Sequence, residues 1–373
     1  MIILSPISSG ELAQRIASLR GAAAAVVYSF AGAKEFRKIW YDQWRSAVIS
    51  SYGSALEELG LNPYFVDVRS FALQALDGSL PTVICSFNLN AGVTPIHHWG
   101  IVPSVAAWAE IKPFPADVDV LIVGERKDTA AFLAQSAGLK VARTFAFNEL
   151  AQVAPELPII LKPRDMGGSV GVRRTQASEV VDDTVSLSPG TIIQEFIKGY
   201  DLTVPIVWQP TKGKHRAPAG ILYIPDDGTD GTDGSWFHSE ESKRRGTGYQ
   251  KLVVEIPADA EEAISRFAEH AELGPYARVD FRLPVSSVET RQSNPTISAD
   301  TMKFIEVNPL PTLRSGINFL NAVAGNRFQS EFETEIDSLS SLLGRQPSEH
   351  ALVLACALAT LEGVTPRATH DEI

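Results

Sequence analysis

Apolar residues in the first third of the chain follow two alternating patterns. Short continuous runs rich in β-branched and aromatic residues predict buried strands at residues 23–30, 64–68 and 81–87. Between the first two runs, residues 35–59 carry apolar side chains at helical spacing, and Gly60 ends that pattern. Strand–helix–strand order of this kind predicts a parallel sheet with helices on its faces.

A proline-rich stretch, residues 103–115, interrupts this pattern and indicates a boundary between two parts of the chain. Beyond it, continuous apolar runs predict strands at residues 118–123, 157–161 and 191–194. Residues 128–137 have the spacing of a short helix, so the second part also mixes strands and helices.

The last third of the chain combines a hairpin pattern with a helical one. Apolar runs at residues 277–283 and 302–308 flank a polar insertion, which predicts two strands joined as a long hairpin. Residues 339–361 have apolar side chains at helical spacing. A segment rich in glycine and aspartate, residues 226–234, is predicted to be a solvated loop.

Composition narrows the class of protein. The chain has 373 residues, 45% of them hydrophobic, which is enough for a large core divided between two or three domains. A formal net charge of −11 argues against a surface built for nucleic acid or anionic lipid. The two cysteines, Cys85 and Cys356, lie in separate apolar stretches and are predicted to be buried thiols. Because no apolar run reaches the roughly 18 residues of a membrane span, we expect a soluble cytoplasmic protein.

The predicted hairpin carries four polar residues at period two. Side chains alternate between the faces of a strand, so Arg278 shares a face with Asp280, and Glu306 shares one with Asn308. If the strands pair, Asp280, Glu306 and Asn308 offer hard oxygen ligands of the kind that Mg²⁺ takes together with phosphate and water. Arg278 beside them has a planar donor fork suited to phosphate or carboxylate. The alternative is an exposed hairpin face with ordinary charge pairs.

A lysine and a glycine-rich loop follow the predicted strand 157–161. Lys162 ends the strand, and Gly167, Gly168 and Gly171 follow, so backbone N–H groups could approach phosphate oxygens closely. The spacing fits neither a Walker loop nor a dinucleotide-binding loop. Taken alone, the segment is more often a flexible surface hairpin than a phosphate clamp.

Residues 194–201 form a short crossover after the strand 191–194. Its backbone groups could face an adenine edge, and Asp201 could accept hydrogen bonds from ribose hydroxyls. Many loops have a similar sequence, so this segment gains weight only in combination with the others.

In order and separation, these segments resemble the D-alanine–D-alanine ligase branch of the ATP-grasp family, from about Val118 to Phe319. The resemblance implies a set of ATP-binding residues: Lys127, Lys162, Gly168, Ser169, Gln194, Glu195, Ile197, Asp201 and Lys243. It further implies a Mg²⁺ site at Asp280, Glu306 and Asn308, and catalytic roles for Arg278, at the oxyanion, and for Lys243.

The resemblance also implies the fold. We expect an α/β protein of the ATP-grasp type, with an N-terminal Rossmann-like domain at residues 1–117. Two α+β subdomains, a central one at residues 118–197 and a C-terminal one at residues 198–373, would hold ATP between them.

The positions that would hold the two amino acids depart from the family pattern. The family has a glutamate after its first strand, for which only Glu35 is a candidate here. Thr312 stands where the family has a glycine, and Ile317 stands where it has a serine. Arg314 lies in the same turn and could bind a substrate carboxylate or stabilise the turn itself. Specificity for D-alanine is therefore not expected.

The sequence thus predicts an ATP- and Mg²⁺-dependent ligase that joins a carboxylate to an amine through an acyl-phosphate. The substrates would be small molecules, and the sequence leaves open whether the protein is a homodimer. Two alternatives remain: another ATP-grasp transfer, such as thiol ligation or carboxylation, and a protein that binds ATP without turnover. The identity of the substrates does not follow from the sequence.

Overall fold

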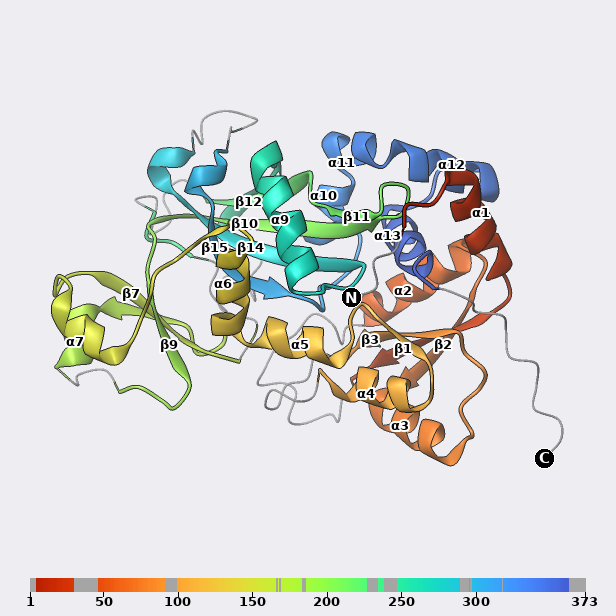
Figure 1. The fold of residues 1–373 in the computed structure, drawn as a ribbon, viewed down its shortest axis with the longest axis horizontal. Coiled ribbons are helices and arrows are strands. Elements are labelled where there is room, and N and C mark those ends of the chain that lie inside the picture. Colours follow the sequence, from red (N-terminus) through yellow and green to blue (C-terminus); the bar gives the residue numbers. More distant parts are fainter. Residues whose placement is uncertain are drawn as a thin grey trace.

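Three β-sheets organise the molecule (Figure 1). The computed structural model describes residues 5–29, 46–90, 99–165, 167, 169–182, 186–226, 234–237, 247–288, 295, 297–316 and 318–361. None of the helices in this part of the chain has the length and apolar character that crossing a bilayer requires.

The first sheet is parallel, as the sequence predicts, with strand order β2-β1-β3-β4. Its strands are β1 (Ala23–Tyr28), β2 (Asn62–Asp67), β3 (Cys85–Leu89) and β4 (Lys112–Phe114). Its helices are α2 (Ser46–Glu58), α3 (Val68–Asp77) and α4 (Ile101–Trp108). The proline-rich stretch therefore does not interrupt this unit, because it supplies α4 and the edge strand β4. Proline is tolerated in both places, where no ladder or helical N–H is lost.

The second and largest sheet is almost entirely antiparallel, with order β13-β12-β10-β14-β15-β5. Its strands are β5 (Lys140–Val141), β10 (Gly199–Gln209), β12 (Ala219–Pro225), β13 (Tyr249–Glu255), β14 (Tyr276–Pro284) and β15 (Lys303–Asn308), with β11 (Lys214–Arg216) paired to β10. The β14–β15 pairing confirms the predicted hairpin. Helix α9 (Ala258–His270) lies against this sheet in Figure 1.

Residues 118–123, predicted as a strand, instead form the helix α5 (Val118–Glu125). A short apolar run does not separate a buried strand from a buried helix by its pattern alone. The helix buries Val120, Leu121 and Gly124, and Gly124 approaches Pro309 so closely that a Cβ there would lie 2.3 Å from the proline Cδ. Helix α6 (Lys127–Ser136) follows, close to the predicted 128–137, and ends before Gly138.

The third sheet is small and antiparallel, with order β6-β9-β7-β8, and it projects from the rest of the molecule in Figure 1. Its elements are β6 (Thr144–Phe145), the 3-10 helix Phe147–Gln152, β7 (Pro158–Pro163), β8 (Arg173–Gln176), α7 (Ala177–Val181) and β9 (Thr191–Glu195). Strands β7 and β9 confirm the predicted strands at 157–161 and 191–194. A separate apolar cluster that includes Ile159, Leu161 and Ile193 forms its core.

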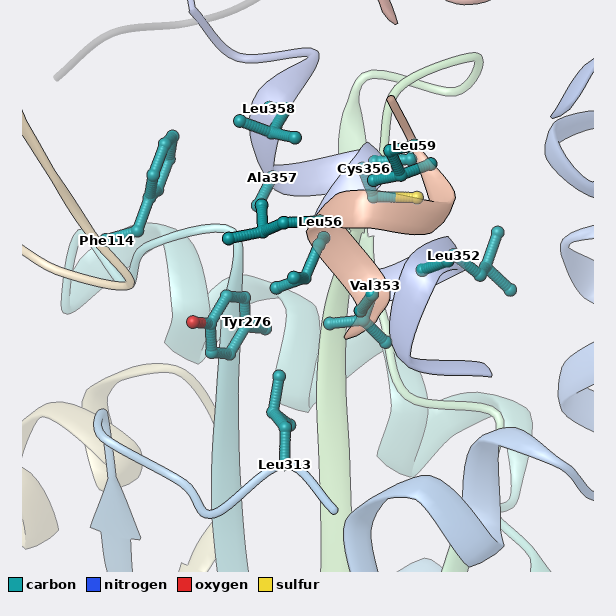
Figure 2. Packing of buried hydrophobic residues seen from close by; sticks show 14 of the residues in the cluster. Leu56, Leu59, Phe114, Tyr276, Leu313, Leu352, Val353, Cys356, Ala357 and Leu358 are labelled. Carbon is teal, nitrogen blue, oxygen red and sulfur yellow. The ribbon is translucent and has the colours of Figure 1, made fainter. Parts of the chain in front are cut away.

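The last helix returns to helix α2 beside the first sheet, and Figure 2 shows residues of the two helices packed together. Helix α13 (Glu349–Leu358) packs against α2, with Tyr276 of β14 and Leu313 in the same buried cluster. Cys85 and Cys356 are buried, free thiols, as expected. The remaining helical elements are α1 (Ser9–Ser18), Val285–Ser287, Ala299–Thr301, α10 (Asn318–Val323), α11 (Asn326–Glu331) and α12 (Glu333–Leu343). The boundaries at residues 117 and 197 stay a prediction.

Candidate nucleotide and metal site

The four polar residues of the hairpin lie opposite one another in register. Arg278 pairs with Asn308, and Asp280 pairs with Glu306. The register shifts immediately afterwards, because Phe281 pairs with Phe304 and leaves Ile305 as an extra residue on β15. Such a bulge changes which face the following side chains occupy. If side chains simply alternated along β15, Phe304 and Glu306 would share a face. The bulge instead puts Phe304 in the core while Glu306 faces Asp280.

Asp280 is held from two sides. Its Oδ2 accepts from Nη2 of Arg278 at 2.7 Å, and its Oδ1 accepts from the hydroxyl of Thr203 at 2.7 Å. Thr203 lies directly opposite Asp280 on β10. These contacts fix the carboxylate, because both oxygens have a donor in a partly buried position. Thr203 was not among the predicted residues, and only the strand pairing brings it to this place.

Two buried lysines approach Glu306 from different elements. Nζ of Lys127, at the start of α6, lies 3.7 Å from Oε2 of Glu306. Nζ of Lys162, at the end of β7, donates to the carbonyl of the bulged residue Ile305 at 3.4 Å. The backbone N–H of Lys127 also donates to the carbonyl of Arg164, at 3.3 Å, so the two lysine-bearing segments are joined. The structure therefore brings Lys127, Lys162 and Glu306 together.

Burial shifts the pKa of two groups in and beside this cluster. Burial lowers the pKa of Lys162 to about 8, with Lys127 acting in the same direction and Glu306 opposing it. Glu125, at the end of α5, is also buried, and burial together with Asp165 raises its pKa to about 7. Glu125 was not a predicted site residue, and a lone glutamate in a helix gives no pattern by which to find it. Burial thus moves the pKa of Lys162, a predicted phosphate-binding lysine, and that of Glu125, near Lys127, toward neutrality.

The glycine-rich loop connects β7 to β8. Ser169 adopts a positive φ of 64°, which a residue with a Cβ seldom does. Gly171 has φ of 71°, and a Cβ there would lie 2.9 Å from the Pro163 ring. Gly168 lies outside the described residues. The loop's contact with phosphate remains a prediction.

The predicted adenine and ribose residues follow one continuous path from β9 into β10. Gln194 is buried and donates to the Ala142 carbonyl at 3.3 Å. Glu195 and Ile197 are half-buried. Asp201 accepts at Oδ1 from Nη1 of Arg282 at 2.8 Å. The sequence analysis missed Arg282, although it stands two residues beyond Asp280 in the same period-two pattern.

The oxygen donors fit a hard cation. Asp280 and Glu306 face each other, and Asn308 adds an amide oxygen that at present accepts from the N–H of Leu310 at 2.9 Å. Within the described residues no group of three or more His, Cys, Asp or Glu side chains could hold a metal. Two carboxylates and an amide suit Mg²⁺, which takes few protein ligands and completes its shell with phosphate and water.

Two buried polar atoms near the turn after β15 have no hydrogen-bond partner among the described residues: Nε of Arg278 and Oδ1 of Asn318. Thr312 and Arg314, in the same turn, are half-buried. Glu35, Lys243 and Ile317 lie outside the described residues, so their predicted positions are untested. A buried, unpaired guanidinium N–H is costly unless something else accepts from it, which is consistent with a substrate oxygen at this point.

The order of the sheets and the site between them define the class of protein: the chain has the ATP-grasp fold. A D-alanine–D-alanine ligase of Bacillus anthracis, solved in complex with ATP, matches with a TM-score of 0.56 and 13% identity, over 87% of this chain and 99% of that one. The ATP-grasp ligase PsnB, solved with a phosphomimetic variant of its minimal precursor, Mg and ADP, matches with a TM-score of 0.52 and 14% identity. That match covers 86% of this chain and 99% of PsnB.

The sequence itself is similar to the same group. The D-alanine–D-alanine ligase of Clostridium perfringens (strain SM101 / Type A) is 25% identical over 190 residues, which are 49% of this chain and 53% of that protein. The chain thus matches about half the length of this relative. No family model matches the sequence. The resemblance inferred from the motifs is therefore confirmed, and at these identities it fixes the fold.

Proposed function

We propose that this protein is an ATP-dependent ligase that joins a small-molecule carboxylate to an amine. One observation carries the proposal: Lys127, Lys162 and Glu306 converge from three separate elements beside Asp280 and Arg278. Buried cations of this kind are needed where a carboxylate must approach a triphosphate, because the two anions repel. The central subdomain at residues 118–197 and the C-terminal one at residues 198–373 would hold ATP between them.

The reaction would proceed in two displacements. A carboxylate oxygen of the first substrate attacks the γ-phosphorus, and the bond to the β,γ-bridging oxygen breaks to release ADP. The amine then attacks the acyl carbon, the C–O bond to phosphate breaks, and the amine loses a proton. Lys127 and Lys162 would orient the triphosphate, and Nε of Arg278 would donate to the oxygen that becomes negative in the second step.

Asp280, Glu306 and Asn308 would hold Mg²⁺. When bound, Mg²⁺ would neutralise charge on the phosphates and orient them. The pairing of Arg278 with Asp280 would keep the guanidinium beside the metal ligands without consuming its Nε donor. Lys243, in the stretch after the glycine- and aspartate-rich segment, would supply a third positive charge.

The substrates are proposed to differ from two D-alanines. Thr312 adds a side chain where the ligase pattern has a glycine, and Asn318 has a buried amide oxygen that can accept from an amine. Burying a substrate group without its partner costs on the order of 1–3 kcal/mol, enough to change specificity.

The proposal is tested in two stages. Thermal unfolding with and without ATP and Mg²⁺ comes first, and ATP at about 100 times a typical Kd should stabilise the protein by about 2.7 kcal/mol. Phosphate release is then measured against a panel of amino acids and dipeptides, with D-alanine alone as one member. No stabilisation by ATP would overturn the proposal. Robust turnover with millimolar D-alanine alone would overturn only the substrate claim.

A further inference from the structure

Arg282 is a buried arginine that binds four acceptors at once. It lies on β14, is 3% exposed, and pairs in register with Asp201 of β10. Nη1 donates to Oδ1 of Asp201 at 2.8 Å, and Nε donates to the carbonyl of Ile197 at 2.9 Å. Nη2 donates to the carbonyls of Gly234, at 3.1 Å, and of Trp236. One guanidinium thereby joins the strand that carries Asp201 to two other stretches of chain.

Residues 234–237, here called the strap, are held from two sheets. Arg282 of the large sheet binds the carbonyls of Gly234 and Trp236, and Arg174 of the small sheet donates to the carbonyl of Ser235 at 3.0 Å. The Gly234 carbonyl also accepts from the N–H of Gly199 at 2.8 Å. Three consecutive carbonyls are therefore fixed by two arginines whose strands belong to different sheets.

Two further features fix the strap. Gly234 has φ of 85°, and a Cβ there would lie 2.8 Å from the Gly199 nitrogen and 2.2 Å from a Val285 methyl, so only glycine fits. Phe196 contacts both arginines, with each guanidinium carbon 5.2 Å from the ring centre. The ring of Phe237 meets Phe196 edge-on at 6.2 Å.

We propose that Arg282 is a positioning residue that fixes the Asp201 carboxylate for the nucleotide's ribose and ties it to the strap. The proposal rests on the function proposed above, because it assumes that ATP lies against residues 194–201. A carboxylate accepts hydrogen bonds at two oxygens, and one salt bridge to a rigid fork orients the whole group. Recognition of ribose hydroxyls then depends on Arg282, which need not contact the nucleotide.

Arg174 provides a matched comparison within the same cluster. It contacts Phe196 at the same 5.2 Å and also binds a strap carbonyl, but it is exposed, and its described contacts do not include Asp201. A purely structural role for the two arginines predicts that Arg174→Met and Arg282→Met act alike on nucleotide recognition. A positioning role predicts that only Arg282→Met changes it.

The test compares the affinities of ATP and 2′,3′-dideoxy-ATP, each with Mg²⁺, by titration calorimetry. We expect the full-length wild type to bind ATP at least about tenfold more tightly than the dideoxy analogue, the loss typical of a polar partner left unpaired. In Arg282→Met this preference should fall to within about threefold of unity, while Arg174→Met keeps it. The preference of Arg282→Lys, which retains the charge without the planar fork, should lie between those of these two variants. This lysine variant replaces Arg282→Met in the test if the methionine variant does not fold.

The outcomes separate the two proposals. If the wild type binds no ATP, the ligase proposal fails and this one falls with it. If the wild type binds ATP and the dideoxy analogue equally, the ATP site stands and the role of Arg282 is overturned. The same role is overturned if Arg282→Lys and Arg282→Met keep the full preference, or if Arg174→Met loses it to the same extent.

Discussion

Arg278 and Arg282 project from the same face of β14, four residues apart, and differ in how fully they are bonded. Arg282 donates to a carboxylate and three carbonyls and lies against an aromatic ring. Arg278 donates to Asp280, and its buried Nε has no partner among the described residues. A guanidinium that the protein saturates fixes structure, whereas one that it leaves unsaturated can bind a substrate. In the proposed function, the end of β14 at Arg282 would be the nucleotide end and the end at Arg278 the reaction end.

The largest effect should come from the reaction end, at Glu306. Changing Glu306 to Gln removes the charge that faces Asp280 and lies 3.7 Å from Lys127. Turnover should fall by about a thousandfold or more, because a bound cation contributes several kcal/mol of charge stabilisation. ADP release at saturating substrate measures it, with circular dichroism to confirm the fold. Glu255→Gln, at an exposed position of β13, is the control. Near-normal activity in Glu306→Gln would remove the metal assignment.

Arg278→Lys should give the next largest effect and sharpen the contrast with Arg282. Lysine keeps a positive charge beside Asp280 but has no Nε at the place where the buried donor lies. The rate at saturating substrate should fall about 100-fold, as for the loss of one oxyanion donor, while ATP affinity stays within about threefold. Arg266→Lys, on the exposed side of α9, should leave both unchanged. A loss of ATP affinity as large as the loss of rate would place Arg278 at the nucleotide instead.

The hairpin that carries both arginines could be predicted from the sequence, because period-two polar residues on two apolar runs specify strands and faces directly. The same local reasoning failed at residues 118–123, where a short apolar run is equally compatible with a buried helix. It also could not supply Thr203, whose contact with Asp280 depends on the pairing of β10 with β14. Strand pairing over such a separation is a tertiary property.

The lysines show a different limit. Nothing in the local pattern distinguishes Lys127 from a solvated lysine, and its role was implied by the family resemblance alone. Lys162 ends a predicted strand before a glycine-rich loop, but that pattern is more often a flexible surface hairpin than a phosphate clamp. The structure supplies the physical reason: both are buried, and both lie beside the bulge that holds Ile305 and Glu306. Arg282 was within reach of the sequence, since it continues the alternation of Arg278 and Asp280.

A smaller effect is expected where α5 supports the reaction end. Gly124 lies against Pro309, the residue after Asn308, and an added Cβ would meet Pro309 Cδ at 2.3 Å. Gly124→Ala should destabilise the protein by about 1–3 kcal/mol, because overpacking against a ring exceeds the gain in helix propensity of about 1 kcal/mol. Urea unfolding measures the change. Gly10→Ala in α1, with nothing closer than 4.0 Å, should stabilise instead. An equal rise in the free energy of unfolding in both variants would show that Pro309 moves away from the added Cβ without a measurable cost.

The smallest effect is expected at the root of β14, by which we mean its first residue, Tyr276, buried in the same apolar cluster as α2 and α13. His350 is 2% exposed, and its Nδ1 shares a hydrogen bond of 2.8 Å with the hydroxyl of Ser51. Its ring also contacts the ring of Tyr52, whose hydroxyl lies 3.3 Å from that of Tyr276. Burial lowers the pKa of His350 to about 3, from 6.5 in an exposed imidazole. Between these values the unfolded chain binds a proton that the folded protein excludes. The contribution of His350 to the free energy of unfolding is therefore fully present above pH 6.5 and is lost as the pH falls toward 3.

The loss from one such group between pH 7 and pH 5 is about 2 kcal/mol of unfolding free energy. His350→Gln should lower stability at pH 7, since it disturbs a packed position, but should lose about 1–2 kcal/mol less than the wild type on going to pH 5. Urea unfolding at several pH values gives the slopes directly. Parallel slopes in the wild type and His350→Gln would mean that this histidine takes up its proton in the folded state, and the core at the root of β14 would then have to open to water at mildly acidic pH.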